Sequence, residues 1–319
     1  MEKISARGMP FNLEMAINNA LQKQVNTSID SHKISELHFE FNFEKSRGKL
    51  PNKFNVLILW EPESVMPWQY KRSVLNKFDL IIPMSPWRAI NLGIAHWAFH
   101  PSKIESISID ENLRNKNIVM VNAAKFSGSN KSFYGLRRKI SKKLQSMNIG
   151  YELYGQNWHM KKSKELRERI WAVRKELLAL NFPSLLEAFS EITYGYPEFL
   201  GPLDDKLSKL SEYRYSLVIE NDPDWITEKL FDALSARCVP IYIGPNLSRF
   251  KLLSKCVIQL EPSVKAIEQF FISDNIDLYN LKKAAVDDFA SYSEDLKLFA
   301  LESVSDEISS IVKNHYLTL

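Results

Sequence analysis

The chain of 319 residues lacks the features that mark secreted, membrane-spanning and metal-binding proteins. Its two cysteines, Cys238 and Cys256, are too few for a disulfide framework and lie outside any metal-ligand spacing. No run of about 18 apolar residues occurs, so we expect no membrane-spanning helix. The first residues contain no continuous apolar segment, which argues against a secretory signal. These absences predict a cytoplasmic protein in a reducing compartment.

Charge of one sign is not in large excess either. The formal net charge is +4 and the sequence pI is about 8.8, which suits an anionic ligand or simply a slightly basic surface. The stripe of basic residues typical of a dedicated nucleic-acid binder is missing, so we expect no nucleic-acid partner. With 45% hydrophobic and 25% charged residues the composition is that of a soluble globular protein. The length exceeds one usual core and predicts two domains.

Short apolar runs alternate with helical patterns, which predicts an α/β protein with mostly parallel sheets. The polar segment 109–117 is expected to be a linker, so we predict an N-terminal α/β domain over 1–112 and a C-terminal one over 113–300. A C-terminal helix within 301–319 should pack on the body of the protein. A membrane-surface helix would look similar, but the polar side of this one carries as many acids as bases. The runs expected to form strands lie at 37–43, 54–60, 78–84, 118–124, 151–155, 213–219 and 239–244.

The segment "ENDPDWITEKLFDALSARCVPIYIGP", residues 220–245, places many charges where a strand meets a helix. Thr227 is positioned as a helix N-cap, and Glu228 in the first turn suits the positive end of the helix dipole. Lys229 opposes that dipole, which is understandable if an anion docks there. Judged from these residues alone, a phosphate-ligand site and an ordinary helix start are equally well supported interpretations.

The stretch "YRYSLVIEN…WITEKLFDALSARCVPIYIGP" resembles the donor-binding signature of the α-1,3/4-fucosyltransferases of glycosyltransferase family 10. "YGQNW" at 154–158 resembles the Tyr-Gly segment that precedes the signature, and Arg137 sits like an arginine on the helix before it. The resemblance is firm over 118–245 and weak before it. Two departures stand out: Asn221 and Lys229 are eight residues apart where the family commonly has ten, and Trp225 replaces a tyrosine.

The resemblance implies an α/β protein of GT-B type, with two Rossmann-like domains facing across a cleft. The C-terminal domain would bind GDP-fucose, the N-terminal one would contribute to the acceptor site, and fucose would be transferred with inversion. Lys229 and Arg137 would neutralise the diphosphate, and Glu228 would bind the ribose hydroxyls. No metal or other cofactor is implied. The residues expected at the donor site are Arg137, Glu220, Asn221, Trp225, Thr227, Glu228 and Lys229.

Inverting transfer needs a general base for the acceptor hydroxyl. Glu61 is the first carboxylate after the strand at 54–60 and is our predicted base, with Glu63 as the alternate; acids that are merely solvated at a strand end remain an alternative. His96, His100 and His159 have no partner at metal spacing and are expected to be structural.

The leading prediction is therefore a fucosyltransferase that decorates a glycan, for example a bacterial surface polysaccharide. One alternative is another GDP- or UDP-sugar as donor, given the shortened turn. A second is a glycan- or nucleotide-binding protein that has lost catalysis. Trp68, Tyr70 and Trp87 could stack on acceptor sugars or belong to the core. The basic face of a predicted helix at 161–181 is expected to be solvated, with contact to an anionic lipid-linked acceptor at the inner face of the membrane as a minor alternative.

Overall fold

The computed structural model describes residues 5–7, 11–28, 33–34, 36–41, 50–105, 107–127, 129–158, 195–273, 276–289 and 293–317. The chain divides into two compact units, the first formed by residues 1–103 and 296–319 and the second by residues 104–295. The division therefore lies at 103/104, where the sequence predicts 112/113, and the C-terminal segment returns to the first unit. The predicted helix at 161–181 and His159 lie outside the described residues.

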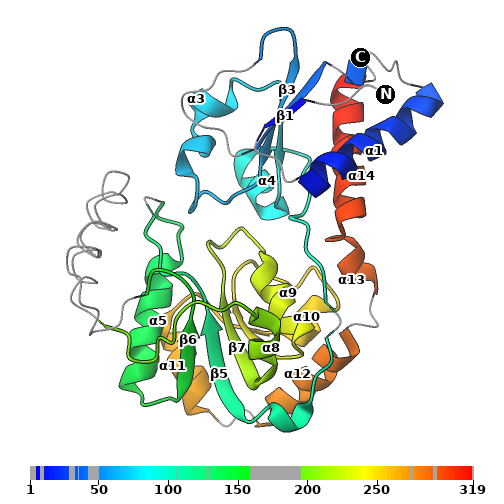
Figure 1. Ribbon diagram of the computed structural model, residues 1–319. Helices are drawn as coiled ribbons and strands as arrows, with labels where there is room; N and C mark the ends of the chain where they lie inside the picture. Colours follow the sequence, from blue (N-terminus) through cyan, green and yellow to red (C-terminus); the bar gives the residue numbers. More distant parts are fainter. Residues whose placement is uncertain are drawn as a thin grey trace. The chain divides into compact units, whose positions relative to one another are not determined.

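The first unit is built on a sheet of four parallel strands in the order β1-β2-β3-β4 (Figure 1). Its two longest strands are almost entirely buried, as expected for parallel strands that helices cover. The three predicted strands of this unit are confirmed, each within a few residues. The strands are β1 (Ser5–Arg7), β2 (Leu37–Phe41), β3 (Phe54–Leu59) and β4 (Leu80–Pro83).

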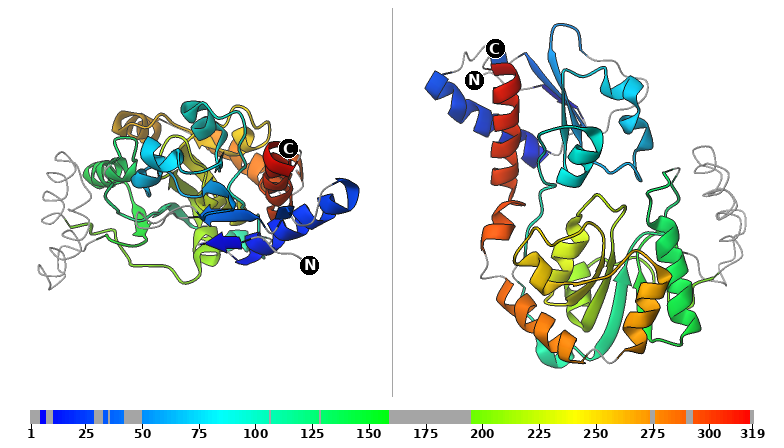
Figure 2. Two further views of the ribbon diagram at one scale, coloured as in Figure 1. Left: turned by 90° about the horizontal axis from the view of Figure 1, so that it is seen from above. Right: turned by 180° about the vertical axis from the view of Figure 1, so that it is seen from behind.

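Helix α14 packs along α1 in this unit, although the two lie at opposite ends of the chain (Figures 1 and 2). Its buried residues include Val304, Ile308, Ile311 and Val312, which are the apolar positions that recur at helical spacing in the sequence. The C-terminus thus completes the core of the first unit. The helical segments are α1 (Phe11–Ser28), η1 (Pro67–Tyr70), α3 (Arg72–Leu75), α4 (Pro86–Leu92), α14 (Leu301–Val312) and the π-helical η3 (Lys313–Leu317), with α13 (Ser293–Lys297) at the passage between the units.

The second unit holds a five-stranded parallel sheet in the order β6-β5-β7-β8-β9. In this order the chain starts in the middle, moves to one side and then returns past its start to the other side. Such a reversal leaves a crevice at the carboxyl ends of the central strands, where open α/β sheets bind ligands. The strands are β5 (Lys116–Val121), β6 (Tyr151–Tyr154), β7 (Tyr213–Ile219), β8 (Val239–Ile243) and β9 (Ile258–Gln259).

Helices connect these strands as the sequence predicts. Helix α9 packs on β7 and β8 beside α8, whereas α11 packs beside α5 (Figures 1 and 2). The helical segments are η2 (Glu111–Leu113), α5 (Tyr134–Ser146), α8 (Lys206–Ser211), α9 (Glu228–Ser235), α10 (Leu253–Cys256), α11 (Val264–Ile272) and α12 (Ile276–Phe289).

The polar segment expected to be a linker is instead anchored in the second unit. The guanidinium of Arg114 donates hydrogen bonds to the carbonyl oxygens of Tyr213 and Ala236, the latter at 3.1 Å, and it pairs with Glu111. These bonds tie residues just before β5 to β7 and α9. A charged stretch looks like a linker in sequence because its partners lie about a hundred residues away.

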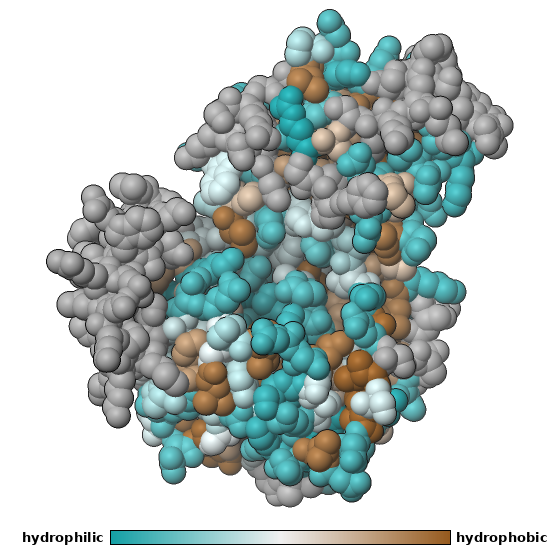
Figure 3. Space-filling view, viewed as in Figure 1, coloured by the Kyte–Doolittle hydropathy of each residue, from teal (hydrophilic) through white to brown (hydrophobic). Residues whose placement is uncertain are grey.

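Figure 3 shows that the face of the second unit seen in Figure 1 is mostly hydrophilic, with small separate hydrophobic patches. Among the described residues no helix is long and apolar enough to cross a membrane. Cys238 and Cys256 are free thiols in the interior, and burial raises the pKa of each to about 12. Both thiols are thus held in the protonated, unreactive form.

Candidate functional site

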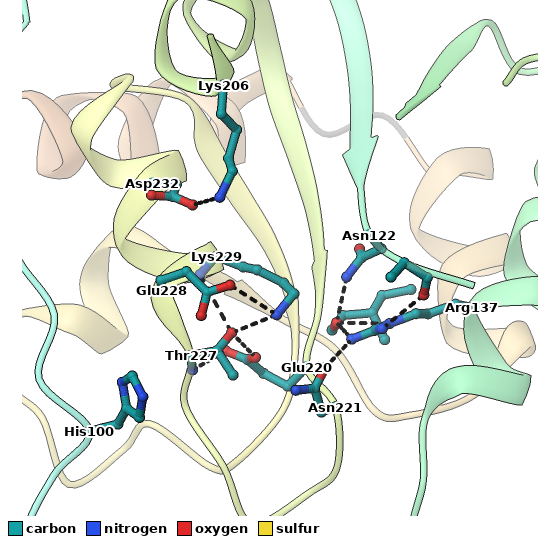
Figure 4. A network of polar contacts seen from close by, with 12 residues as sticks. His100, Asn122, Arg137, Lys206, Glu220, Asn221, Thr227, Glu228, Lys229 and Asp232 are labelled. Carbon is teal, nitrogen blue, oxygen red and sulfur yellow. Dashed lines mark hydrogen bonds and ion pairs between the residues drawn. The ribbon is translucent and has the colours of Figure 1, made fainter. Parts of the chain in front are cut away.

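The centre of the candidate site is the carboxyl end of β7, which is tied to its neighbours through one backbone oxygen. The carbonyl oxygen of Ile219 accepts hydrogen bonds from Asn122 Nδ2 at 2.9 Å and from Arg137 Nη2 at 2.6 Å. Asn122 follows β5 and Arg137 lies on α5, so three elements meet at this point (Figure 4). The arrangement fixes the end of β7, from which Glu220 and Asn221 emerge.

Gly155, directly after β6, allows a close approach to this point. Its φ is +134°, and a Cβ added there would lie 2.0 Å from the carbonyl oxygen of Asn122. No other residue type fits such a position without moving the backbone. The glycine of "YGQNW" is therefore required by the packing of β6 against the end of β5.

Arg137 is fully buried and its guanidinium holds several parts of the site together. Besides Ile219, its guanidinium bonds to the carbonyl of Ala123 at 3.1 Å and to Asn221 Oδ1 at 2.9 Å. Burial lowers its pKa to about 10, an effect that the phenolic group of Tyr134 and the carboxylates of Glu220 and Glu228 oppose. The sequence predicts that Arg137 neutralises a diphosphate; the structure places it where it holds the strand ends and Asn221.

The turn from Asn221 to Thr227 is compact and largely buried. Asp222 Oδ1 accepts a hydrogen bond from the Asp224 N–H at 3.0 Å, and Trp225 is only 1% exposed. The Trp225 ring thus lies in the interior and is not presented to a ligand. Asp224 faces Lys131, whose ammonium lies 3.7 Å from its carboxylate. This pair joins the loop after β5 to the turn after β7.

Glu220 lies entirely beneath this turn. Its carboxylate accepts hydrogen bonds from the Thr227 N–H at 3.0 Å, from the Thr227 hydroxyl at 2.6 Å and from the Tyr242 hydroxyl at 3.4 Å. Burial raises its pKa, while the Lys229 charge and the bonds from Thr227 act in the opposite direction. Burial also raises the pKa of Tyr242, helped by the Glu220 charge. The predicted donor residue Glu220 therefore has no exposed surface in this structure.

Thr227 caps α9, as the sequence predicts. Its backbone is extended and its hydroxyl accepts a hydrogen bond from the Lys229 N–H, so it satisfies one of the N–H groups that the first turn of a helix cannot pair internally. The same hydroxyl accepts a bond of 3.0 Å from Lys229 Nζ. Glu228 precedes Lys229 with its side chain 54% exposed, whereas that of Lys229 is 17% exposed. A cation, an accessible carboxylate and the positive end of a helix dipole therefore share one helix start (Figure 4).

Two cavities open among the loops that follow the strands of this sheet. One, of about 290 Å³, lies between the loop after β5 and the first turns of α5, and Arg138 and Lys139 contribute to its wall. The other, of about 640 Å³, is lined by residues after β8 and β9 and by α11, and contains no lysine or arginine. Asn130 and Ser132, the sequence neighbours of Lys131, also line the first cavity.

In the first unit the two candidate bases have different surroundings. Glu63 Oε2 accepts a hydrogen bond of 2.8 Å from Arg88 Nη1, and Arg88 is 2% exposed. Glu61 is held through its backbone, because the Tyr70 hydroxyl donates a bond of 2.6 Å to its carbonyl oxygen. The Tyr70 ring also lies 5.0 Å from the Arg88 guanidinium. Trp68, Tyr70 and Trp87 are half-buried in this region.

His96 and His100 contact a backbone oxygen or aromatic rings, as expected for structural histidines. His96 Nε2 bonds to the Ile81 carbonyl oxygen at 2.8 Å, and its ring contacts that of His315. The His100 ring lies 4.4 Å from that of Trp60. Among the described residues no group of three His, Cys, Asp or Glu side chains could hold a metal ion. Asp222 and Asp224 have the spacing of an Asp-x-Asp pair, but one bonds within the turn and the other faces Lys131.

Sequence reasoning missed three members of this site: Asn122, Lys131 and Tyr242. Asn122 is a polar residue at the end of an apolar strand, a signal that was available. Lys131 stands just before α5, where its charge resembles any loop lysine. Tyr242 lies within the apolar run of β8, and nothing local indicates that its hydroxyl reaches Glu220.

Comparison with known proteins agrees with this fold. No family model matches the chain. A putative fucosyltransferase-like protein of Arabidopsis thaliana is 34% identical over 85 residues, which cover 24% of this chain and 16% of that protein. The chain thus matches only about a sixth of that relative's length.

Solved structures resemble the chain over nearly its whole length. HepE of Anabaena, in complex with UDP and glucose, aligns with a TM-score of 0.54 at 11% identity, covering 93% of this chain and 82% of HepE. Sucrose-phosphate synthase of Thermosynechococcus elongatus aligns with a TM-score of 0.52 at 12% identity, covering 98% and 81%. The chain has the GT-B fold, with two parallel-sheet α/β domains.

Proposed function

We propose that this chain is an inverting glycosyltransferase that transfers L-fucose from GDP-fucose to a hydroxyl group of a glycan. The observation that carries the proposal is the start of α9. There the Lys229 ammonium, held by Thr227, lies at the first turn of a helix at the carboxyl edge of a parallel sheet. That combination suits the diphosphate of a nucleotide sugar.

The remaining residues take roles around that diphosphate. Glu228, exposed next to Lys229, would accept hydrogen bonds from the ribose, and Asn221, held by Arg137, would contact the sugar. Lys131 would add a second cation on the α5 side. The leaving diphosphate would be stabilised by these cations and helix N–H groups, and no metal is part of the proposal.

Glu61 would remove the proton from the acceptor hydroxyl as the new bond forms. The ion pair with Arg88 leaves Glu63 the less suitable base, because its carboxylate is already engaged by a buried guanidinium. The acceptor would be a glycan or glycoconjugate, and the expected cytoplasmic location and contact with a lipid-linked acceptor belong to the same proposal.

Two observations support fucose as the sugar: the resemblance of 213–245 to the family 10 signature and the partial match to a fucosyltransferase-like protein. A different GDP- or UDP-sugar is the second candidate. It is favoured by the shortened turn between Asn221 and Lys229 and by the likeness in fold to a protein solved with UDP and glucose.

A panel of nucleotide sugars offered to the purified protein tests the proposal, with binding and slow hydrolysis as readouts. We expect GDP-fucose to bind and to be hydrolysed faster than GDP-mannose, UDP-glucose or UDP-galactose. Turnover of a UDP-sugar in place of GDP-fucose would assign the second candidate. Absence of binding to every member of the panel would overturn the glycosyltransferase assignment.

A further inference from the structure

Glu220 carries a chain of hydrogen bonds that ends at Lys229. The carboxylate accepts from the hydroxyl of Thr227, and that hydroxyl accepts from the Lys229 ammonium and from the Lys229 N–H. A hydroxyl has one hydrogen to donate and two lone pairs to accept with. The Thr227 hydroxyl uses all three, so its orientation is fully determined (Figure 4).

We propose that Glu220 is a positioning residue for the donor diphosphate: its carboxylate orients the Thr227 hydroxyl, and the hydroxyl orients the Lys229 ammonium. This inference rests on the proposed role of Lys229 in nucleotide binding. Glu220 itself touches no ligand, since it is completely buried and Gly244 closes the space beside it. At Gly244 a Cβ would lie 2.7 Å from the Glu220 Cγ atom, so the strand end is packed tightly against the carboxylate.

The alternative view of Glu220 as a simple structural acid does not account for its partners. A structural N-cap needs only the Thr227 hydroxyl and its bond to the helix N–H. Here a second, charged acceptor is buried behind the cap, at a cost in desolvation that raises the pKa of Glu220. The buried carboxylate accepts the hydrogen of the Thr227 hydroxyl. Both lone pairs of that hydroxyl therefore point toward Lys229.

Occupation of the site should also change the protonation of Glu220. The groups that face it are Tyr242 from β8, Thr227, Glu228 and Lys229 from α9, and Arg137 from α5. The positive charge of Lys229 opposes the effect of burial. A bound diphosphate offsets that positive charge, so the pKa of Glu220 rises further and the protein takes up protons when the nucleotide binds.

Calorimetric titration of GDP into the full-length protein, in two buffers with different enthalpies of ionisation, measures both affinity and proton uptake. We expect Thr227→Val to weaken GDP binding roughly tenfold and Thr227→Ser, which keeps the hydroxyl, to restore most of the affinity. Glu220→Gln, which mimics the protonated carboxyl and keeps an oxygen acceptor for the Thr227 hydroxyl, should bind GDP nearly as the wild type does and remove the proton uptake expected of the wild type. Should Glu220→Gln fail to fold, the Thr227→Val and Thr227→Ser pair decides.

The inference is overturned if Thr227→Val binds GDP as the wild type does, or if a folded Glu220→Gln takes up as many protons as the wild type. Lys229→Ala separates this outcome from a failure of the proposed function. If Lys229→Ala weakens GDP binding while Thr227→Val does not, only the positioning role of Glu220 is lost. If Lys229→Ala binds GDP normally, the proposed diphosphate site itself is wrong.

Discussion

The guanidinium of Arg88 donates a hydrogen bond of 2.8 Å to the carboxylate of Glu63, and this ion pair separates the two candidate bases. Arg88 is 2% exposed and the Glu63 side chain 29%, so Glu63 compensates a buried charge. Two residues earlier, Glu61 is positioned by a bond to its backbone from Tyr70. The two acids of the loop after β3 thus differ in their contacts: Glu63 pairs with Arg88 through its carboxylate, whereas Tyr70 bonds to the backbone of Glu61.

We therefore predict that Glu61→Gln abolishes transfer while leaving donor binding unchanged, because a carboxamide cannot accept the hydroxyl proton. Glu63→Gln should lower the free energy of unfolding by roughly 1 to 3 kcal/mol, since Arg88 loses a charged partner. Transfer rates, GDP affinity and urea unfolding of both variants test this. Normal transfer by Glu61→Gln, with transfer lost in a stably folded Glu63→Gln, would exchange the two assignments.

Arg137→Met should act on stability. The substitution leaves the carbonyl oxygens of Ile219 and Ala123 without the guanidinium and frees Asn221, so we expect the free energy of unfolding to fall by at least about 2 kcal/mol. Lys229→Ala should lower it less, by about 1 kcal/mol, because it removes one bond to the Thr227 hydroxyl and the charge that faces Glu220. Chemical denaturation of the two variants shows whether Arg137 acts mainly by stabilising the fold. A loss of nucleotide affinity in Arg137→Met without any loss of stability would contradict this role.

Gly155→Ala tests the packing of β6 against β5. The new methyl group would overlap the carbonyl oxygen of Asn122 at a backbone angle that alanine disfavours, so we expect a loss of about 2 kcal/mol or more. Gly150→Ala is the matched control, because a Cβ there has no atom within 4 Å. It should stay within about 0.5 kcal/mol of the wild type. Equal thermal midpoints for both variants would refute the account of Gly155.

Acid stability should depend on Glu152, at the other end of the second sheet. Burial opposes ionisation, but bonds from Tyr154, Tyr213 and Lys116 outweigh it and lower the pKa of Glu152 from 4.5 to about 2. A depressed pKa stabilises the fold above the unfolded value, and this contribution is lost as the pH falls from about 4.5 toward 2. After allowance for solvent screening it amounts to about 1 to 3 kcal/mol.

Glu152→Gln should remove that part of the acid sensitivity. Its free energy of unfolding should therefore change less over this pH range than that of the wild type, although it is lower near neutral pH. Urea titrations at several acidic pH values provide the comparison. Parallel curves for the two proteins would show that Glu152 is not the group responsible.

The sequence predicts local features of this protein well and distant contacts poorly. The strand–turn–helix–strand segment 213–243, with Thr227 as the cap of α9, follows from hydrophobic periodicity and capping chemistry, both of which act over a few residues. Arg137 lies on a helix, as the resemblance implies, but the direction of its side chain is not predicted. Its partner at Ile219 lies 82 residues away, and only the pairing of β5 with β7 brings the two together.

The same reasoning explains the domain boundary and Glu220. Residues 109–117 look like a linker because the bonds of Arg114 to Tyr213 and Ala236 cannot be seen locally. Glu220 looks like a ligand-facing acid because it ends a strand, whereas the turn that follows folds back over it. Strand-end position predicts nearness to the site; which atoms face a ligand depends on how the next loop closes.

The central claim is that the start of α9 binds the diphosphate of a nucleotide sugar, and calorimetric titration of guanosine, GMP and GDP tests it most directly. The wild type should bind GDP at least tenfold more tightly than guanosine, roughly 1.4 kcal/mol, and Lys229→Ala should lose this advantage. Lys265→Ala, which removes an exposed lysine on α11, should keep it. Equal binding of guanosine and GDP by the wild type, or an unchanged GDP affinity in Lys229→Ala, would contradict the claim.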